Sequence, residues 1–241
     1  AHQSMIESQR RETHRRIART IETVFPEIAE NRPELLAHHH QEAQQNTKAT
    51  EFAIAAGQLS LSRSAAIEAL GQCQRALQWL PNIENELTRN SLEVGLNAVI
   101  ISASLSLDGF TSTTAAETAQ RTLELAATMS SPPSTVMALY TLTVHNHVTS
   151  HRGEAMAMGN RFVENAEAHG EEDALGAARV VLAQCHWADG NFQEAINLCN
   201  RAIESYQYDR DRLLGYRLGV DILANAFMTK VTPLWVIGRA K

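Results

Sequence analysis

Apolar residues recur at steps of three and four positions on both sides of a short polar break within residues 182–206. The first expected helix ends at Asp189-Gly190-Asn191, where Gly190 supplies the left-handed backbone that a helix end favours. The second expected helix has one apolar stripe, formed by Phe192, Ala195, Ile196, Cys199 and Ala202. Because alanine side chains let two helix backbones approach closely, the pattern predicts a helical hairpin.

The same spacing occurs earlier in the chain, in residues 50–83. Counted from Thr50, small residues and a closing proline stand at positions 8, 20, 27 and 32, and they are Gly57, Ala69, Ala76 and Pro81. In the later hairpin Ala183, Ala195 and Ala202 take the first three of these positions. The spacing resembles the tetratricopeptide repeat, a unit of about 34 residues that buries its apolar face by stacking on its neighbours. This resemblance implies an all-α fold, a right-handed α-α superhelix (a solenoid of antiparallel helix pairs).

Helical patterns account for most of the remaining chain. We expect N-terminal helices in residues 1–46, and then four to five helix pairs in residues 47–241 that form one continuous solenoid. The first helix is expected over residues 5–25, with an apolar stripe formed by Ile6, Ile17, Ile21, Val24 and Phe25. Residues 130–134 read as an inter-repeat loop in which Ser134 caps a helix over Val136–Val148. Near the C-terminus, Asp209–Arg212 reads as a solvated turn, and Pro233 is expected to kink or end a helix.

Composition excludes several classes of function. The net charge of −6 argues against a general nucleic-acid binder. No uninterrupted apolar run approaches the length of about 20 residues that a membrane span needs, and no signal peptide is visible. The three cysteines fall inside helical patterns without metal-binding spacing, so we expect buried free thiols and a cytoplasmic location.

The histidines are the candidates for a metal site. His38, His39 and His40 are adjacent, but neighbouring helix residues point about 100° apart, so the three cannot all face one ion. His38 with Glu42, and His147 with His151, have the i,i+4 spacing of ligand pairs, yet neither pair completes a site. We therefore expect packed or solvent-facing histidines, and no metal or cofactor ligand.

Sequence motifs of catalysis are missing as well. The chain has no GxxxxGK[ST] phosphate loop, no GxGxxG, no HExxH and no GxSxG. No catalytic residue is predicted, and this chain is not expected to be an enzyme.

Several blocks follow one another in the order seen in a known family. His14-Arg15-Arg16-Ile17-Ala18 precedes Phe25-Pro26-Glu27-Ile28-Ala29, and the block Pro33-Glu34-Leu35-Leu36-Ala37-His38-His39 follows. Trp235-Val236-Ile237-Gly238 comes near the end. Together they resemble the tetratricopeptide-like C-terminal region of large bacterial signalling proteins that carry a class III adenylate or guanylate cyclase and an AAA/STAND-type ATPase. Where that family has Asp-Pro-Gly, this chain has Asp221-Ile222-Leu223, which leaves a turn or a continuing helix open there.

The resemblance implies a non-catalytic scaffold, the regulatory and protein-interaction region of such a signalling protein, with cyclase and ATPase motifs outside these residues. Its expected partners are a protein, a peptide or neighbouring domains of the same chain, recognised by the inner helices. A homodimer through the terminal helices near Trp235 is a further expectation. Two alternatives stay open: the repeat region of a STAND-ATPase transcription regulator, and a histidine-dependent metalloprotein.

Overall fold

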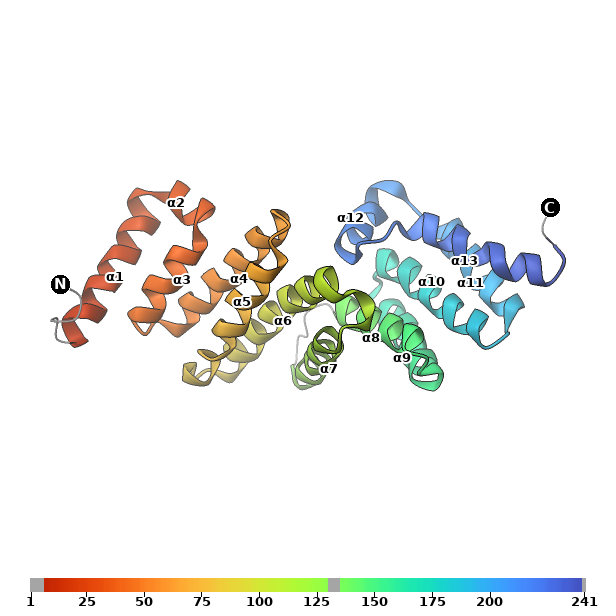
Figure 1. Cartoon of the computed structure of the whole chain (residues 1–241), viewed down its shortest axis with the longest axis horizontal. Coiled ribbons are helices and arrows are strands. Elements are labelled where there is room, and N and C mark those ends of the chain that lie inside the picture. The colour runs from red at the N-terminus through yellow and green to blue at the C-terminus, as the bar shows by residue number, and fades with distance from the viewer. Residues whose placement is uncertain (1–6, 130–134, 240–241) are drawn as a thin grey trace. The chain divides into compact units, whose positions relative to one another are not determined.

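The computed structural model describes residues 7–129 and 135–239, and within these ranges every regular element is a helix (Figure 1). The prediction of an all-α protein is confirmed. The expected loop and the Ser134 cap lie outside the described residues. The α-helices are α1 (Glu7–Val24), α2 (Pro26–Asn31), α3 (Pro33–Glu42), α4 (Asn46–Ser62), α5 (Ala66–Leu77), α6 (Glu86–Asp108), α7 (Thr113–Thr128), α8 (Val136–Val148), α9 (Arg152–His169), α10 (Glu172–Ala188), α11 (Phe192–Ser205), α12 (Tyr208–Leu218) and α13 (Ile222–Val236), with 3-10 turns at η2 (Leu80–Asn82) and η3 (Gly109–Thr111).

Contacts divide the chain into two compact units. Unit 1 comprises Ala1–Gly109 and Glu124–Pro133, and unit 2 comprises Phe110–Leu123 and Ser134–Lys241, so the division passes through α7. Residues 1–46 group with the helices that follow them. The single continuous solenoid over 47–241 stays a prediction.

The core of unit 1 lies between α4, α5 and α6. α4 packs against α3, α5 and α6. Gly57 of α4 lies at the closest approach: a Cβ there would stand 2.7 Å from Cys73 Sγ and 2.8 Å from Val99 Cγ1. Ala69 and Ala76 of α5 are fully buried in the same core. Small side chains at these positions thus let three helices meet.

α6 is apolar for most of its length. Among the described residues it is the one helix that, extended to Thr111, is long and apolar enough to cross a membrane, and 44% of its apolar window of 18 residues is buried inside the fold. Sequence analysis overlooked it because serine and asparagine residues interrupt the apolar run. Its buried Leu96, Val99 and Ile100 belong to the core of unit 1, so packing accounts for its composition.

Unit 2 is organised around α10, which packs against α8, α9, α11, α12 and α13. The hairpin predicted over 182–206 is confirmed as the end of α10 and the whole of α11. Gly190 in its turn has the left-handed backbone expected there, with φ at +79°. The core of this hairpin buries Leu182, Ala183, Ala195, Leu198 and Cys199.

Six of the inter-helix turns share one hydrogen-bond pattern. In each, the residue after the left-handed position donates its backbone N–H to the carbonyl five residues earlier, as in the Schellman motif. The donor and acceptor residues of the six turns are Gln45 and His40, Ala65 and Ser60, His151 and Asn146, Glu171 and Ala166, Asn191 and His186, and Val220 and Gly215. Because the turns are built alike, each directs the next helix back along the previous one.

The first predicted helix is present as α1, and its buried face matches the predicted apolar stripe only in part. His14, Ala18 and Ile21 are buried, whereas Ile17, Val24 and Phe25 are exposed. The prediction was right for Ile21 and wrong for Ile17, Val24 and Phe25, because it counted only apolar side chains and α1 places His14 in its packed face. Ile6 lies outside the described residues. The short helix α2 was not expected.

Two predictions near the C-terminus are corrected, and one question left open there is answered. Asp209–Arg212 lies in helix α12 and is no solvated turn: Asp211 is buried, pairs with Arg210 and accepts a hydrogen bond from the backbone N–H of Gln207 at 2.9 Å. Helix α13 does not end at Pro233 but continues to Val236. The sequence left open whether a helix continues through Asp221. The structure has a turn there, because the Asp221 carboxylate caps α13 by accepting a hydrogen bond from the Ala224 N–H at 2.9 Å.

Candidate functional site

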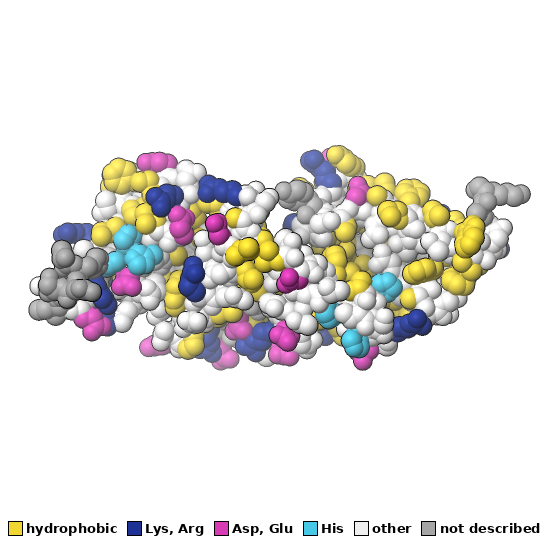
Figure 2. Space-filling view, in the orientation of Figure 1, with side chains coloured by type: hydrophobic (Ala, Val, Ile, Leu, Met, Phe, Trp, Pro, Cys, Tyr) yellow, Lys and Arg dark blue, Asp and Glu magenta, His cyan; other side chains and the backbone are white. Residues whose placement is uncertain are grey.

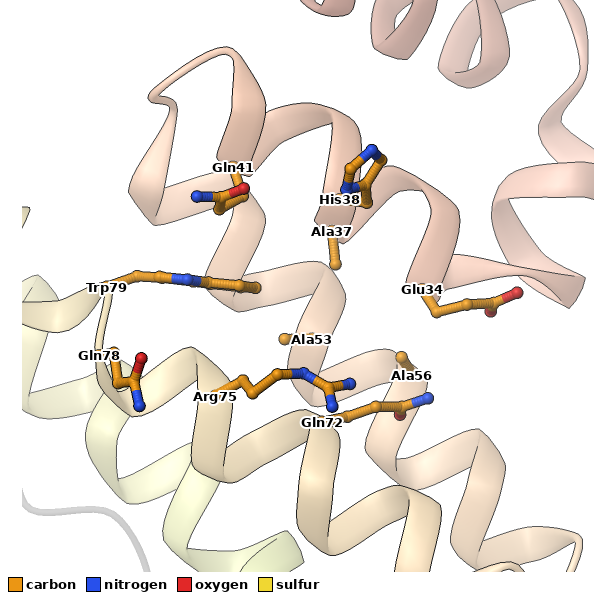
Figure 3. A pocket seen from close by; sticks show the side chains of 10 residues that line it. All are labelled: Glu34, Ala37, His38, Gln41, Ala53, Ala56, Gln72, Arg75, Gln78 and Trp79. Atoms are coloured by element: carbon orange, nitrogen blue, oxygen red, sulfur yellow. The ribbon is translucent and has the colours of Figure 1, made fainter.

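The candidate site is a groove in unit 1 that runs between α3 and α5 above α4 (Figure 3). Its cavity measures about 490 Å³. α3 contributes Glu34, Ala37, His38 and Gln41, α4 contributes Ala53 and Ala56, and α5 with the residues after it contributes Gln72, Arg75, Gln78 and Trp79. The floor is made of alanine side chains, so a ligand can approach the helix backbone closely, while polar side chains stand on both walls.

Arg75 carries the one uncompensated charge of the groove walls. Its side chain is exposed, and within 7–129 and 135–239 its guanidinium makes no hydrogen bond or ion pair. The carboxylate of Glu34 lies at the opposite end from Trp79 and Gln78, and it accepts a hydrogen bond from Arg32 Nε at 3.2 Å (Figure 3). The guanidinium therefore has its donors available for a carboxylate, which it binds in bidentate geometry.

Amide and aromatic side chains complete the walls. Gln41 reaches in from α3, and Trp79 and Gln78 come from the α5 side (Figure 3). Each glutamine offers both a carbonyl acceptor and amide donors, which match the two polar groups of a peptide unit. Trp79 is held in place because it packs against the core of unit 1, and its indole is half-buried.

Sequence analysis did not find these residues. It singled out Gly57, Ala69 and Ala76, which the structure places in the helix contacts, and Pro81, which is exposed in η2. Gln72, Arg75 and Trp79 follow i,i+3,i+7 spacing on α5 and just beyond it, directly beside the face that carries Ala69 and Ala76. That polar and aromatic face was the available signal. In the later hairpin Ala183, Ala195 and Ala202 are likewise buried, Phe192 is half-buried and Gly190 is exposed in the turn.

A cluster of histidines adjoins the groove. His14 of α1 meets His38 and His39 of α3, with Nδ1 of His14 2.9 Å from Nδ1 of His39. The ring centroids are 5.6 Å apart for His14 and His38 and 5.3 Å apart for His38 and His39. Burial lowers the pKa of His39 below its ordinary value of 6.5, and the rings of His14, His38 and His40 lower it further. Figure 2 shows histidine side chains gathered over this part of unit 1.

His40 points away from that cluster, as the angular argument from sequence predicted. Its Nδ1 lies 2.9 Å from Gln45 Oε1, its Nε2 lies 3.1 Å from Glu22 Oε1, and its ring stacks on Phe52. Burial alone would raise the pKa of Glu22, but hydrogen bonds and charge from Lys48 and His40 outweigh it and lower that pKa. His40 is thus a packed residue that joins α1, α3 and α4.

The histidines of unit 2 form no comparable cluster. In the described part of the chain, His14, His38 and His39 are the one group of three potential ligands with all ligand atoms within 4.8 Å of one another. His145 Nδ1 lies 2.9 Å from the backbone carbonyl of Phe110, and His151 Nδ1 lies 2.8 Å from the hydroxyl of Thr149. The i,i+4 pair of His147 and His151 is therefore not extended by a third ligand.

The cysteines are buried free thiols, as predicted. Burial raises the pKa of Cys73 to about 12 and those of Cys185 and Cys199 to about 11. Because the thiolate is the reactive form, these side chains are inert near neutral pH.

The terminal helix presents apolar side chains. Phe227, Met228, Val231 and Trp235 are exposed along α13, where Figure 2 shows hydrophobic side chains. The homodimer expected near Trp235 stays a prediction.

Comparison with known proteins adds no relative: no family model matches this chain, and no curated protein matches it significantly.

Proposed function

We propose that this chain is a non-catalytic helical-repeat scaffold that binds an extended peptide segment of a partner protein, or of a neighbouring domain, in the groove between α3 and α5. The helix pairs are proposed to continue as a right-handed tetratricopeptide-like superhelix. The parent protein is proposed to be a bacterial signalling protein with cyclase and ATPase modules, on the resemblance of the blocks around residues 14–39.

The observation that carries the proposal is the composition of the groove. An available guanidinium, three glutamine amides and an indole stand around an alanine floor together with Glu34 and His38, and Arg75 is the one Lys or Arg among the lining residues. Such walls suit an extended chain, since glutamine side chains pair with peptide groups and a shallow alanine floor accepts a small apolar side chain.

Arg75 defines the expected sequence of the ligand. A free guanidinium on a groove wall favours a carboxylate, from an aspartate or glutamate side chain or from a C-terminus. We therefore expect segments with one acidic position beside small apolar residues. From the sequence we expected the partner to be recognised by the inner helices. The surface proposed from the structure is a different one, the groove between α3 and α5.

Selection from a peptide library tests this proposal. Purified chain is used to select peptides, and affinity is then measured for the wild type, Arg75→Glu and Gln41→Ala. We expect acidic peptides, weakened on the order of tenfold by Arg75→Glu, since a hydrogen bond to a charged group is worth about 1.5–3 kcal/mol. Arg63→Glu is the matched control, because Arg63 is exposed on unit 1 outside the groove. Selection of no peptide above background, or equal binding by Arg75→Glu, would overturn the proposal.

A further inference from the structure

We propose that His14, His38 and His39 form a binding site for one divalent transition-metal ion of the zinc type at the contact between α1 and α3. The inference is independent of the proposed peptide binding, although His38 belongs to both places. It also differs from the pairs that the sequence suggested, because His14 comes from another helix.

The geometry places three nitrogen ligands around one point. All three ligand atoms lie within 4.8 Å of one another, and the Nδ1 atoms of His14 and His39 are already 2.9 Å apart. A tetrahedral zinc ion, with Zn–N bonds of about 2.0–2.1 Å, separates its ligand nitrogens by about 3.3 Å. Small rotations of the His14 and His39 rings, together with movement of the exposed His38 side chain, therefore bring the set to the required spacing.

The donor set selects the class of ion. Imidazole nitrogens suit zinc, cobalt, nickel and copper, whereas calcium and magnesium require oxygen ligands. The three rings leave a fourth position, which solvent can fill.

Charges around the cluster permit a cation. α1 carries arginines on either side of His14, and three of them are paired with carboxylates: Arg10 with Glu42 at 3.7 Å, Arg15 with Glu12 at 2.8 Å, and Arg11 with Glu7. These pairs reduce the repulsion that an entering ion would meet.

Burial is graded across the three ligands. His14 is 3% exposed, His39 is half-buried and His38 is exposed. An ion can thus enter from solvent past His38 and reach a desolvated ligand, where the interaction is stronger. The bound ion would join α1 to α3 and place positive charge at the rim of the groove that His38 lines.

Titration with zinc and cobalt tests the site. The full chain, without a histidine tag, is titrated with ZnCl₂ by calorimetry and with CoCl₂ by visible absorption. We expect one ion per chain, intense cobalt bands typical of four-coordinate geometry, and a rise in the melting temperature with zinc. His38→Ala and His39→Ala should each weaken zinc binding by at least about tenfold. The test does not depend on replacing the buried His14, whose variants can fail to fold.

His169→Ala is the matched control, because this exposed histidine lies at the end of α9 in unit 2. It should leave both stoichiometry and affinity unchanged. Absence of saturable binding at one ion per chain, or equal affinity in the wild type and both cluster variants, would overturn the inference.

Discussion

The Nδ1 atoms of His14 and His39 lie 2.9 Å apart across the contact between α1 and α3. One ring must donate a hydrogen bond and the other must accept it, so the two rings cannot both carry a proton on these atoms. This contact, beside the apolar packing of Ala18 and Ile21, explains why the buried face of the helix includes a histidine.

Gly57 should tolerate no larger side chain. Gly57→Ala is expected to lower the free energy of unfolding by about 1–3 kcal/mol, because the new Cβ meets Cys73 and Val99 at under 3 Å. Gly71→Ala is the matched control in the next helix, where the nearest atom is Arg75 Nη1 at 3.9 Å. That change should stabilise by about 0.5–1 kcal/mol through helix propensity. Urea unfolding measures both, and equal effects would contradict the close packing of α4, α5 and α6.

Glycine should be favoured at the left-handed position of the inter-helix turns. Ser64 has a left-handed backbone with φ at +60°, and Gly190 occupies the matching place in unit 2. Ser64→Gly should raise the free energy of unfolding by about 0.5–1 kcal/mol. The left-handed region costs a non-glycine residue about 1–2 kcal/mol, and removing this cost is partly offset because glycine gives the unfolded chain more conformational entropy. Gly190→Ala should destabilise by about 1 kcal/mol. Thermal unfolding of the two variants checks the opposite signs, and a loss of stability in Ser64→Gly would refute the shared turn geometry.

Acidification should destabilise unit 2 through His147. Burial lowers the pKa of His147 below its ordinary value of 6.5, so the folded chain binds fewer protons than the unfolded chain just below that pH. The stability that neutral His147 gives the folded chain is fully present above pH 6.5, and it is lost as the pH falls toward the lowered pKa. Denaturant unfolding between pH 8 and pH 5 should show a smaller loss for His147→Gln than for the wild type. His169→Gln, at an exposed position, is the control, and an unchanged pH dependence in His147→Gln would count against this assignment.

Helix positions could be predicted from sequence because they depend on local spacing. The hairpin at 182–206 and the helix Val136–Val148 follow from apolar periodicity and glycine placement. The pair of half-buried Arg210 and buried Asp211 could not be predicted, since its charges satisfy each other and the backbone only after folding.

The candidate sites depend on contacts between distant residues. His14 and His39 are separated by 25 positions, and no local pattern brings them together. Arg75 and Gln41 face one groove because α3 and α5 both pack on α4. Sequence identified the alanines that permit this packing, but not the polar side chains that the packing places side by side.

A charge exchange across the groove tests the central claim most directly. Affinity is measured for wild type and Arg75→Glu, each with a selected acidic peptide and with the same peptide carrying lysine at the acidic position. Direct pairing with Arg75 predicts that Arg75→Glu weakens the acidic peptide by about tenfold or more, and that the lysine peptide regains affinity on Arg75→Glu. If the two changes weaken affinity independently, the lysine peptide will bind Arg75→Glu most weakly of the four combinations. That result would contradict peptide binding through this groove.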